Sequence, residues 1–315
     1  MLRTKALRKI FITTLTLFVL LVAYSIPTTE NTHVLKTNLE IEEVANFPTT
    51  SIFLLNDSGY LVKSKIIMDS NDKKEQINKV LISLIEGKSN NSPSGLKAPI
   101  PKNTKIKEII YGDKLVTINF SKEILSVSLE NEKQMIASIT YSILSLKDIK
   151  GINILIEGEK LTEYPNSHEK LPTILDHNLG INKKYDITSR DKITKVVIYY
   201  LERIDGNLFY VPVTKYLNDD REKIKIIVEE LTSSYIYDSN LMSFLNSNTL
   251  LLDYKEEGNV LFLNFNNYLF DENDKLLEEV IYSLAYSVFD NYDVEMVMFE
   301  VNEKEVSHIS AKDLL

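Results

Sequence analysis

Residues 112–161 read GDKLVTINFSKEILSVSLENEKQMIASITYSILSLKDIKGINILIEGEKL, and this stretch decides the fold because the chain contains it twice. The second copy, residues 257–306, reads EGNVLFLNFNNYLFDENDKLLEEVIYSLAYSVFDNYDVEMVMFEVNEKEV. Phe120 aligns with Phe265 at an offset of 145 positions (265 − 120), and this offset holds through both copies without a gap. A constant offset across an alternating segment, a helical segment and another alternating segment predicts a duplicated α/β domain.

Each copy is preceded by a further hairpin and helix. In the first repeat, apolar patterning predicts strands at 51–55 and 60–68, a helix capped by Asn71 or Asp72 that runs to about Glu86, strands at 105–111 and 114–120, a helix at 131–146 and a strand at 152–156. In the second repeat it predicts strands at 196–201 and 208–213, a helix capped by Asp219 or Asp220, strands at 250–254 and 260–265, a helix at 274–289 and a strand at 294–301. The order β-β-α-β-β-α-β favours two tandem two-layer domains of the α+β type, with the helices packed on one face of a small sheet.

The 315 residues are enough for two domains, an anchor and linkers. We expect an N-terminal signal anchor or signal peptide at 1–27 and a stalk at 28–49. The first domain with its C-terminal tail is expected at 50–186, and the second domain at 194–307. The residues after about Ser307 are expected to fray.

A basic segment precedes an apolar run at the N-terminus. Arg3, Lys5, Arg8 and Lys9 come before residues 10–26, a run of 17 residues that is at the lower edge for a membrane-spanning helix. Two interpretations stay open. The run is an uncleaved signal anchor with its basic end in the cytoplasm, or a signal peptide cleaved after the small residues Ala23 and Ser25. Either one places the chain from Thr28 onward outside the cytoplasmic membrane.

Composition excludes several classes of function. The net charge of −9 argues against nucleic acid as a partner. The absence of cysteine excludes disulfides, thiolate metal sites, a catalytic thiol and a lipid-modified cysteine. We therefore expect membrane attachment through a helix.

No motif predicts catalysis, so we expect no enzyme, no cofactor and no metal. The pattern S-x-x-K occurs at Ser70 and at Ser189, but its companion motifs are missing and local capping is the ordinary explanation. The four histidines, His33, His168, His177 and His308, have neither metal-ligand spacing nor a nearby cluster of carboxylates.

The alternation of the strands predicts a candidate partner surface. In the strand at 114–120, Val116, Ile118 and Phe120 share the expected core face. In the second repeat both faces of the strand at 260–265 are apolar, so the sheet face away from the helices would expose its residues to a partner. The residues selected for this surface are Phe262, Met296, Met298 and Tyr199. The alternative, in which these residues are buried in the core or between the domains, stays open.

The stretch PKNTKIKEIIYGDKLVTINFSKEI, followed by a helix and GINILIEGEKL, resembles the GerMN domain family of endospore-forming bacteria. The matching features of the first repeat are the proline-led hairpin, Asn119-Phe120-Ser121 and Glu157-Gly158. The second repeat departs from them, with Asn266 in the place of Ser121 and Asn302-Glu303 in the place of Glu157-Gly158.

The resemblance implies an extracytoplasmic, non-enzymatic interaction module that acts in sporulation or spore germination. We therefore expect a membrane-anchored module of the cell envelope. Most of the chain would lie outside the cytoplasm, and the protein would be secreted if the signal is cleaved. Its expected partners are envelope proteins and further copies of itself, with the membrane reached through the N-terminal helix. The alternative is a module that binds or senses a small ligand or a wall polymer, and a wall hydrolase is a weaker one.

Overall fold

The computed structural model describes residues 48–88, 93–233 and 240–314, which belong to one compact unit. The first repeat contains β1 (Thr49–Asn56), β2 (Leu61–Ile67), α2 (Lys73–Ser83), β3 (Leu96–Lys97), β4 (Ile106–Gly112), β5 (Leu115–Phe120), α3 (Glu132–Leu144), β6 (Gly151–Ile156) and β7 (Glu159–Lys160). The second contains β9 (Ile193–Ile204), β10 (Asn207–Asn218), α4 (Lys223–Thr232), β11 (Leu251–Glu257), β12 (Val260–Phe265), α5 (Glu278–Phe289), β13 (Met296–Val301) and β14 (Lys304–Ser310). Between the repeats lies β8 (Lys184–Asp186), and short 3-10 turns lie at 122–126, 177–179, 267–269 and 311–314.

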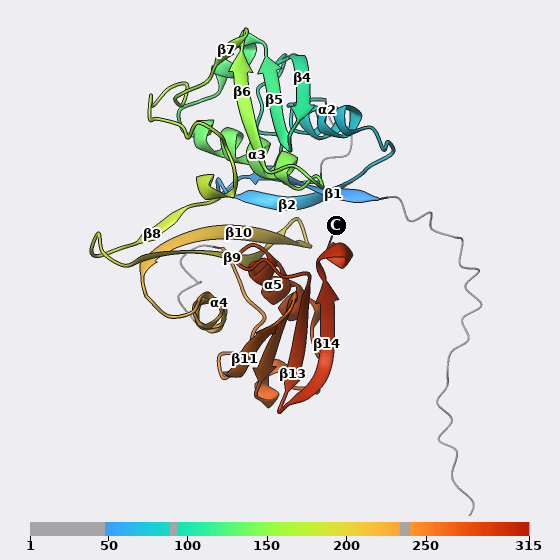
Figure 1. The fold of residues 1–315 in the computed structure, drawn as a ribbon, viewed down its shortest axis with the longest axis vertical. Helices are drawn as coiled ribbons and strands as arrows, with labels where there is room; N and C mark the ends of the chain where they lie inside the picture. Colours follow the sequence, from blue (N-terminus) through green and yellow to red (C-terminus); the bar gives the residue numbers. More distant parts are fainter. Residues whose placement is uncertain (1–47, 89–92, 234–239, 315) are drawn as a thin grey trace, which may run out of the picture. The chain divides into compact units, whose positions relative to one another are not determined.

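The expected fold class and element order are confirmed, but the strands of a repeat do not form one sheet. The strands β4-β5-β6-β7 form one sheet and β11-β12-β13-β14 another. The hairpins β1–β2 and β9–β10 join a separate sheet with the order β3-β1-β2-β10-β8, in which β9 also pairs with β10. In Figure 1 the helices of each repeat therefore lie between two β layers.

The composition of the helices explains this second layer. In α3 every residue from Met135 to Leu144 is buried, and in α5 the same holds for nearly every residue from Val280 to Val288. A helix that is buried all round needs cover on both sides. The hairpin supplies the cover that the four-stranded sheet leaves open.

Several element ends differ from the expectation because nearby side chains are engaged elsewhere. Asp72 caps α2 as expected and accepts a hydrogen bond from the N–H of Glu75 at 2.9 Å. At α4 the N-cap is Glu222, since Asp219 binds Arg221 and Asp220 pairs with Lys192.

The start of α5 and the end of the chain also differ. The expected start near Asp274 is occupied by a loop, in which Asp271 accepts the N–H of Asn273 and of Lys275, so the helix begins at Glu278. The expected fraying after Ser307 is wrong. Residues up to Ser310 pair with β13, and a 3-10 turn follows at 311–314.

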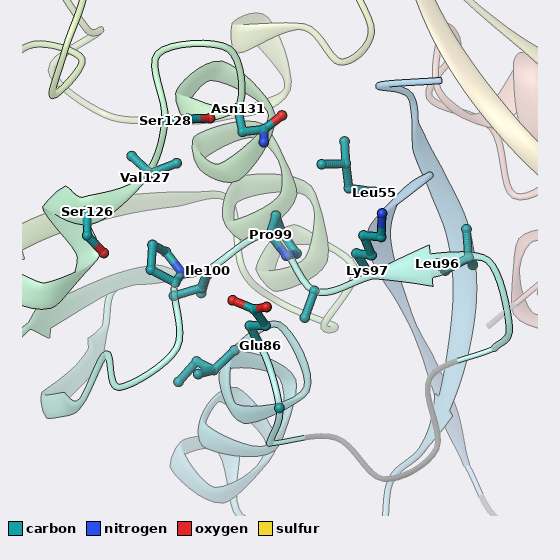
Figure 2. A pocket seen from close by; sticks show the side chains of 14 residues that line it. Leu55, Glu86, Leu96, Lys97, Pro99, Ile100, Ser126, Val127, Ser128 and Asn131 are labelled. Carbon is teal, nitrogen blue, oxygen red and sulfur yellow. The ribbon is translucent and has the colours of Figure 1, made fainter. Parts of the chain in front are cut away.

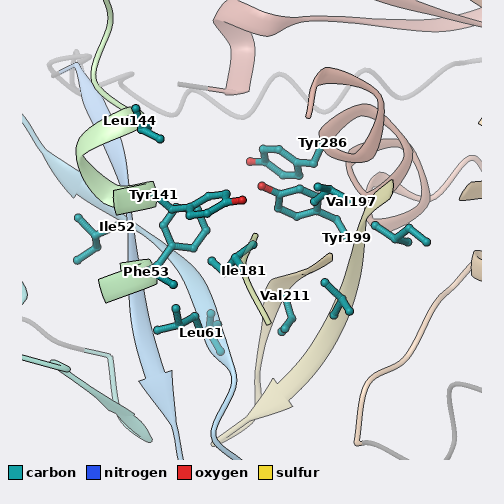
Figure 3. Close-up of a cluster of buried hydrophobic side chains, with 14 of the residues drawn as sticks. Ile52, Phe53, Leu61, Tyr141, Leu144, Ile181, Val197, Tyr199, Val211 and Tyr286 are labelled. Carbon is teal, nitrogen blue, oxygen red and sulfur yellow. The ribbon is translucent and has the colours of Figure 1, made fainter. Parts of the chain in front are cut away.

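The two hairpins hold the repeats together. Tyr210 of β10 pairs with Lys63 of β2, and β8 runs parallel to β10 on the same edge. Figure 3 shows the buried cluster at this junction, with Phe53 and Tyr141 of the first repeat facing Tyr199 and Tyr286 of the second. The sheet therefore continues from one repeat into the other.

The segment between the repeats packs on the first domain, as expected for its C-terminal tail. Leu175 pairs with Ile152 of β6 through two backbone hydrogen bonds of 2.9 Å. The expected anchor or signal segment at 1–27 and most of the stalk at 28–49 lie outside the described residues. Among the residues that the structure does describe, none of the helices is long and apolar enough to cross a membrane.

Candidate functional site

The face of the second four-stranded sheet that points away from α5 gathers the sequence-predicted residues of β12 and β13. Burial alternates along both strands, and Leu261, Leu263 and Phe265 are buried on the helix side. We call the opposite side the outer face; its partly exposed residues are Val260, Phe262, Asn264, Met296, Met298 and Glu300. The register places Phe262 beside Met298 and Val260 beside Met296, so three of the four predicted surface residues come together.

Tyr199 does not belong to this surface, which corrects the sequence-based selection. Its side chain is only 3% exposed, stacks on Tyr286 with ring centroids 5.1 Å apart, and donates its hydroxyl to Asp290 at 2.9 Å. Burial raises its pKa well above the ordinary tyrosine value, with the carboxylate of Asp290 adding to the effect. Tyr199 is therefore buried where the repeats meet, beside Lys63 of the first repeat, which was the alternative that the sequence left open.

An acidic rim borders the outer face. Register places Asp253 of β11 beside Asn264, and Asn264 beside Glu300. With Glu303 and Phe262 these residues line a hollow of about 320 Å³. We call Asp253, Glu300 and Glu303 the acidic rim. Within the described part of the chain, their carboxylates have no ion-pair or hydrogen-bond partner.

Lys255 also lines the hollow, but its ammonium group pairs with Glu257, which does not belong to the acidic rim. The Nζ atom of Lys255 lies 3.2 Å from Glu257 and 4.7 Å from the centre of the Phe262 ring. The ammonium group of Lys255 thus lies against the Phe262 ring, whereas the negative charges of the acidic rim are not neutralised. The sequence pattern does not indicate Asp253 and Glu303 as surface residues beside Phe262, because cross-strand register and not spacing along the chain brings them there.

Hydrogen bonds that recur in both repeats fix the wall of the hollow. Asn264 Oδ1 accepts the N–H of Glu303 at 3.0 Å, and Asn119, 145 positions earlier, accepts the N–H of Gly158 at 3.0 Å. Likewise Asn266 Oδ1 accepts the N–H of Leu250 at 3.1 Å. Its counterpart Ser121 does the same for Lys105 at 2.9 Å. The departures of the second repeat from the sequence motif therefore keep the same bonds.

The outer face of the first repeat differs at the equivalent positions. Thr117, Gly151 and Asn153 stand where the second repeat has Phe262, Met296 and Met298. A side chain at Gly151 would collide with Ile174 of the inter-repeat segment, 2.5 Å away. The first outer face is therefore less apolar and partly covered by the chain itself.

Two other hollows lie in or beside the first repeat. Figure 2 shows one of about 540 Å³ beside the short strand β3, where Glu86 is the single carboxylate among the lining residues. The other, of about 220 Å³, contains Glu169, which is held by Lys133 at 2.6 Å. Glycoside hydrolysis requires two carboxylates across one cleft, and neither hollow supplies such a pair.

The weaker sequence candidates have local roles. Ser70 bonds the side chain of Glu75, and Ser189 bonds the backbone of Asp191, as expected for capping and turns. His168 and His308 each contact one glutamate, whereas the ring of His177 packs edge-on against Tyr141. No group of three or more His, Asp or Glu side chains suited to a metal ion occurs in residues 48–88, 93–233 and 240–314.

Comparisons with known proteins agree with the duplicated fold. The model of the Germane family, described as sporulation and spore germination, matches residues 51–162 and 197–307. The chain is 26% identical over 266 residues to the spore germination protein GerM of Bacillus subtilis (strain 168), covering 80% of this chain and 71% of that protein. The solved structure of the tandem GerMN domains of the sporulation protein GerM from Bacillus subtilis matches with a TM-score of 0.74 at 23% identity. That match covers 82% of this chain and 92% of the other.

Proposed function

We propose that this chain, which belongs to the Germane family of sporulation and spore germination proteins, is a non-enzymatic interaction module of the cell envelope. In this proposal the apolar run at 10–26 anchors the chain or directs its export, and the tandem repeats work outside the cytoplasmic membrane. There they bind envelope proteins during sporulation or germination.

The outer face of the second repeat is the observation that carries the proposal. Phe262 and Met298 lie side by side on strands whose opposite side chains form the core, so their partial exposure does not result from loose packing. Aromatic and methionine side chains are enriched in protein interfaces. Because the hairpin sheet continues between the repeats, this face is presented on a joined scaffold and not on a single small domain.

A ligand-binding or hydrolytic module receives less support. The hollows of the first repeat each have one carboxylate, and the acidic rim of the second lies on an open sheet face. Hydrolysis of a wall polymer needs groups that converge on one bond from two sides of a cleft. A protein partner suits the broad and open geometry better.

The test removes the apolar contacts of the outer face and leaves the fold intact. The double variant Phe262→Ala/Met298→Ala is expressed in sporulating cells in place of the wild-type chain. Its counterpart Thr117→Ala/Asn153→Ala changes the equivalent positions of the first repeat. We expect the first variant to lose at least ten-fold in co-purified envelope protein and in germinating spores, at an unchanged cellular level. Equal behaviour of the two variants, with both proteins folded, would refute the role of this face.

A further inference from the structure

We infer that the outer face of the second repeat receives a cationic protein segment, with Arg or Lys side chains placed over the acidic rim and an apolar side chain placed against Phe262 and Met298. The inference rests on the proposed function and adds the chemistry of the partner.

The negative charges of the acidic rim favour a positively charged ligand in the hollow. Asp253, Glu300 and Glu303 border one hollow and have no cationic partner in the described part of the chain. Like charges gathered at one edge of a sheet repel one another even with a strand between them, and an incoming cation removes that repulsion. The same field disfavours nucleic acid and anionic lipid surfaces, which leaves a polypeptide as the class of macromolecule.

The arrangement of the acids suits a guanidinium or ammonium group. Asp253, Asn264 and Glu300 occupy three neighbouring strands in one row. Adjacent strands lie about 4.8 Å apart, so the two carboxylates start from backbones roughly 10 Å apart with the amide of Asn264 between them. An arginine has five N–H donors in a planar fork and can reach the amide oxygen or a carboxylate while its stem lies on Phe262.

The apolar side chains of Phe262 and Met298 lie next to the acidic rim. Phe262 lines the acidic hollow and also pairs with Met298, so a single extended segment can contact both. The Nζ of Lys255 over the Phe262 ring shows that this ring accepts a cation. An incoming arginine would make the same contact and leave Lys255 with Glu257.

The first repeat lacks this combination, although its backbone repeats the same hydrogen bonds. Glu108 stands in the position of Asp253, but Leu155 and Gly158 replace Glu300 and Glu303. Thr117 and Asn153 replace the two apolar contacts. The first repeat is therefore an internal control for the chemistry of the second.

The experiment uses a fluorescent pentapeptide, acetyl-Leu-Arg-Tyr-Arg-Leu-amide, and its analogue with Glu in place of both Arg. Binding to the full chain in nanodiscs is followed by fluorescence anisotropy at low and at physiological salt. We expect the Arg peptide to bind at least ten-fold more tightly than the Glu peptide, with an affinity that falls as salt rises.

Two charge-matched variants locate the site. The variant Asp253→Asn/Glu300→Gln should weaken binding of the Arg peptide at least ten-fold. The control variant Glu108→Gln/Glu159→Gln removes two exposed charges from the first repeat, and it should change the affinity less than two-fold. Equal losses in both variants would show attraction to net charge alone and overturn the inference. Tight binding of the Glu peptide, or no binding of the Arg peptide, would also overturn it.

The two proposals can fail separately. If Phe262→Ala/Met298→Ala abolishes recovery of envelope proteins while Asp253→Asn/Glu300→Gln leaves it unchanged, the face binds a partner that is not cationic. If neither double variant changes recovery, the proposed function of this face fails as well.

Discussion

Ser142 of α3 and Ser287 of α5, 145 positions apart, make the same tertiary hydrogen bond. The Oγ atom of Ser142 accepts the N–H of Phe53 in β1, and that of Ser287 accepts the N–H of Tyr199 in β9, both at 2.9 Å. At Phe53 the strand β1 has β2 on one side only, because β3 pairs with it only at residues 55 and 56. The helix hydroxyl therefore satisfies a backbone donor that would otherwise lie unpaired at a sheet edge.

These buried serines should contribute measurably to stability. Ser142→Ala and Ser287→Ala each leave a buried N–H without an acceptor, which costs about 1–3 kcal/mol in the free energy of unfolding. Urea unfolding followed by circular dichroism measures the loss. Ser145→Ala is the control, since its hydroxyl bonds only the carbonyl of Tyr141 in the same helix, and it should change stability by less than about 0.5 kcal/mol.

The last hairpin of each repeat is closed by a two-residue turn, and glycine in the second position of this turn should affect stability differently in the two repeats. Glu157 and Gly158 have φ values of 54° and 91°, and Asn302 and Glu303 have 50° and 65°. The second position of the turn is thus a glycine in the first repeat and a glutamate in the left-handed conformation in the second, where glutamate costs about 1 kcal/mol relative to glycine.

Glu303→Gly should therefore raise the midpoint of thermal unfolding, and Gly158→Glu should lower it. Both are measured by calorimetry on the full chain. Glu305→Gly, within the extended strand β14, provides the comparison and should destabilise. A loss of stability in Glu303→Gly would mean that the turn carries no such strain.

Asn182 binds both hairpins of the shared sheet. Its Oδ1 accepts the N–H of Leu61 at 2.9 Å, and its Nδ2 donates to the carbonyls of Leu61 at 2.8 Å and Pro212 at 2.7 Å. Asn182→Ala should lower the unfolding free energy by roughly 2–3 kcal/mol, because three backbone groups lose a partner.

Hydrogen exchange should also show faster opening of Leu61 in Asn182→Ala. Asn178→Ala is the matched change, as its exposed side chain bonds only Asp176 within the same turn. Equal protection of Leu61 in both variants would contradict a joining role for Asn182.

Lys63 makes the junction of the repeats sensitive to pH. Its Nζ lies 3.5 Å from the centre of the Tyr286 ring, and burial lowers its pKa to about 7, although Asp290 partly opposes this effect. Between pH 7 and 10.5 the unfolded chain therefore holds a proton that the folded chain has released. Stability rises with pH in that window and is not lost there.

The contribution of Lys63 amounts to about 2 kcal/mol between pH 7 and pH 9, an interval that ends before ordinary tyrosines titrate. Lys63→Met should remove this part of the rise, as measured by urea unfolding at each pH. The exposed Lys65→Met should keep it. Part of the slope should persist in both variants, since burial also lowers the pKa of Lys183 and Lys195.

Local patterning was enough to predict the repeats and their order of elements. The period-two alternation around Phe120 identified the core face of the first central strand, and the constant offset of the repeat assigned Phe265 to the same face of the second. Both side chains are completely buried. The cap at Asp72, one of the two candidates, was predicted for the same reason, because it depends on residues a few positions apart. Such features follow from backbone geometry that neighbouring residues impose.

Only the tertiary structure decided where each apolar face is covered. The continuous apolar run of β9 indicates that the strand is covered, but not whether its cover is a partner or the rest of the chain. Because the hairpins of the two repeats pair, the Tyr199 side chain is buried inside the molecule. The same dependence on strand register brought Asp253 and Glu303 to Phe262. A sequence records which side of an element is apolar, whereas contacts between residues far apart in the chain determine what that side meets.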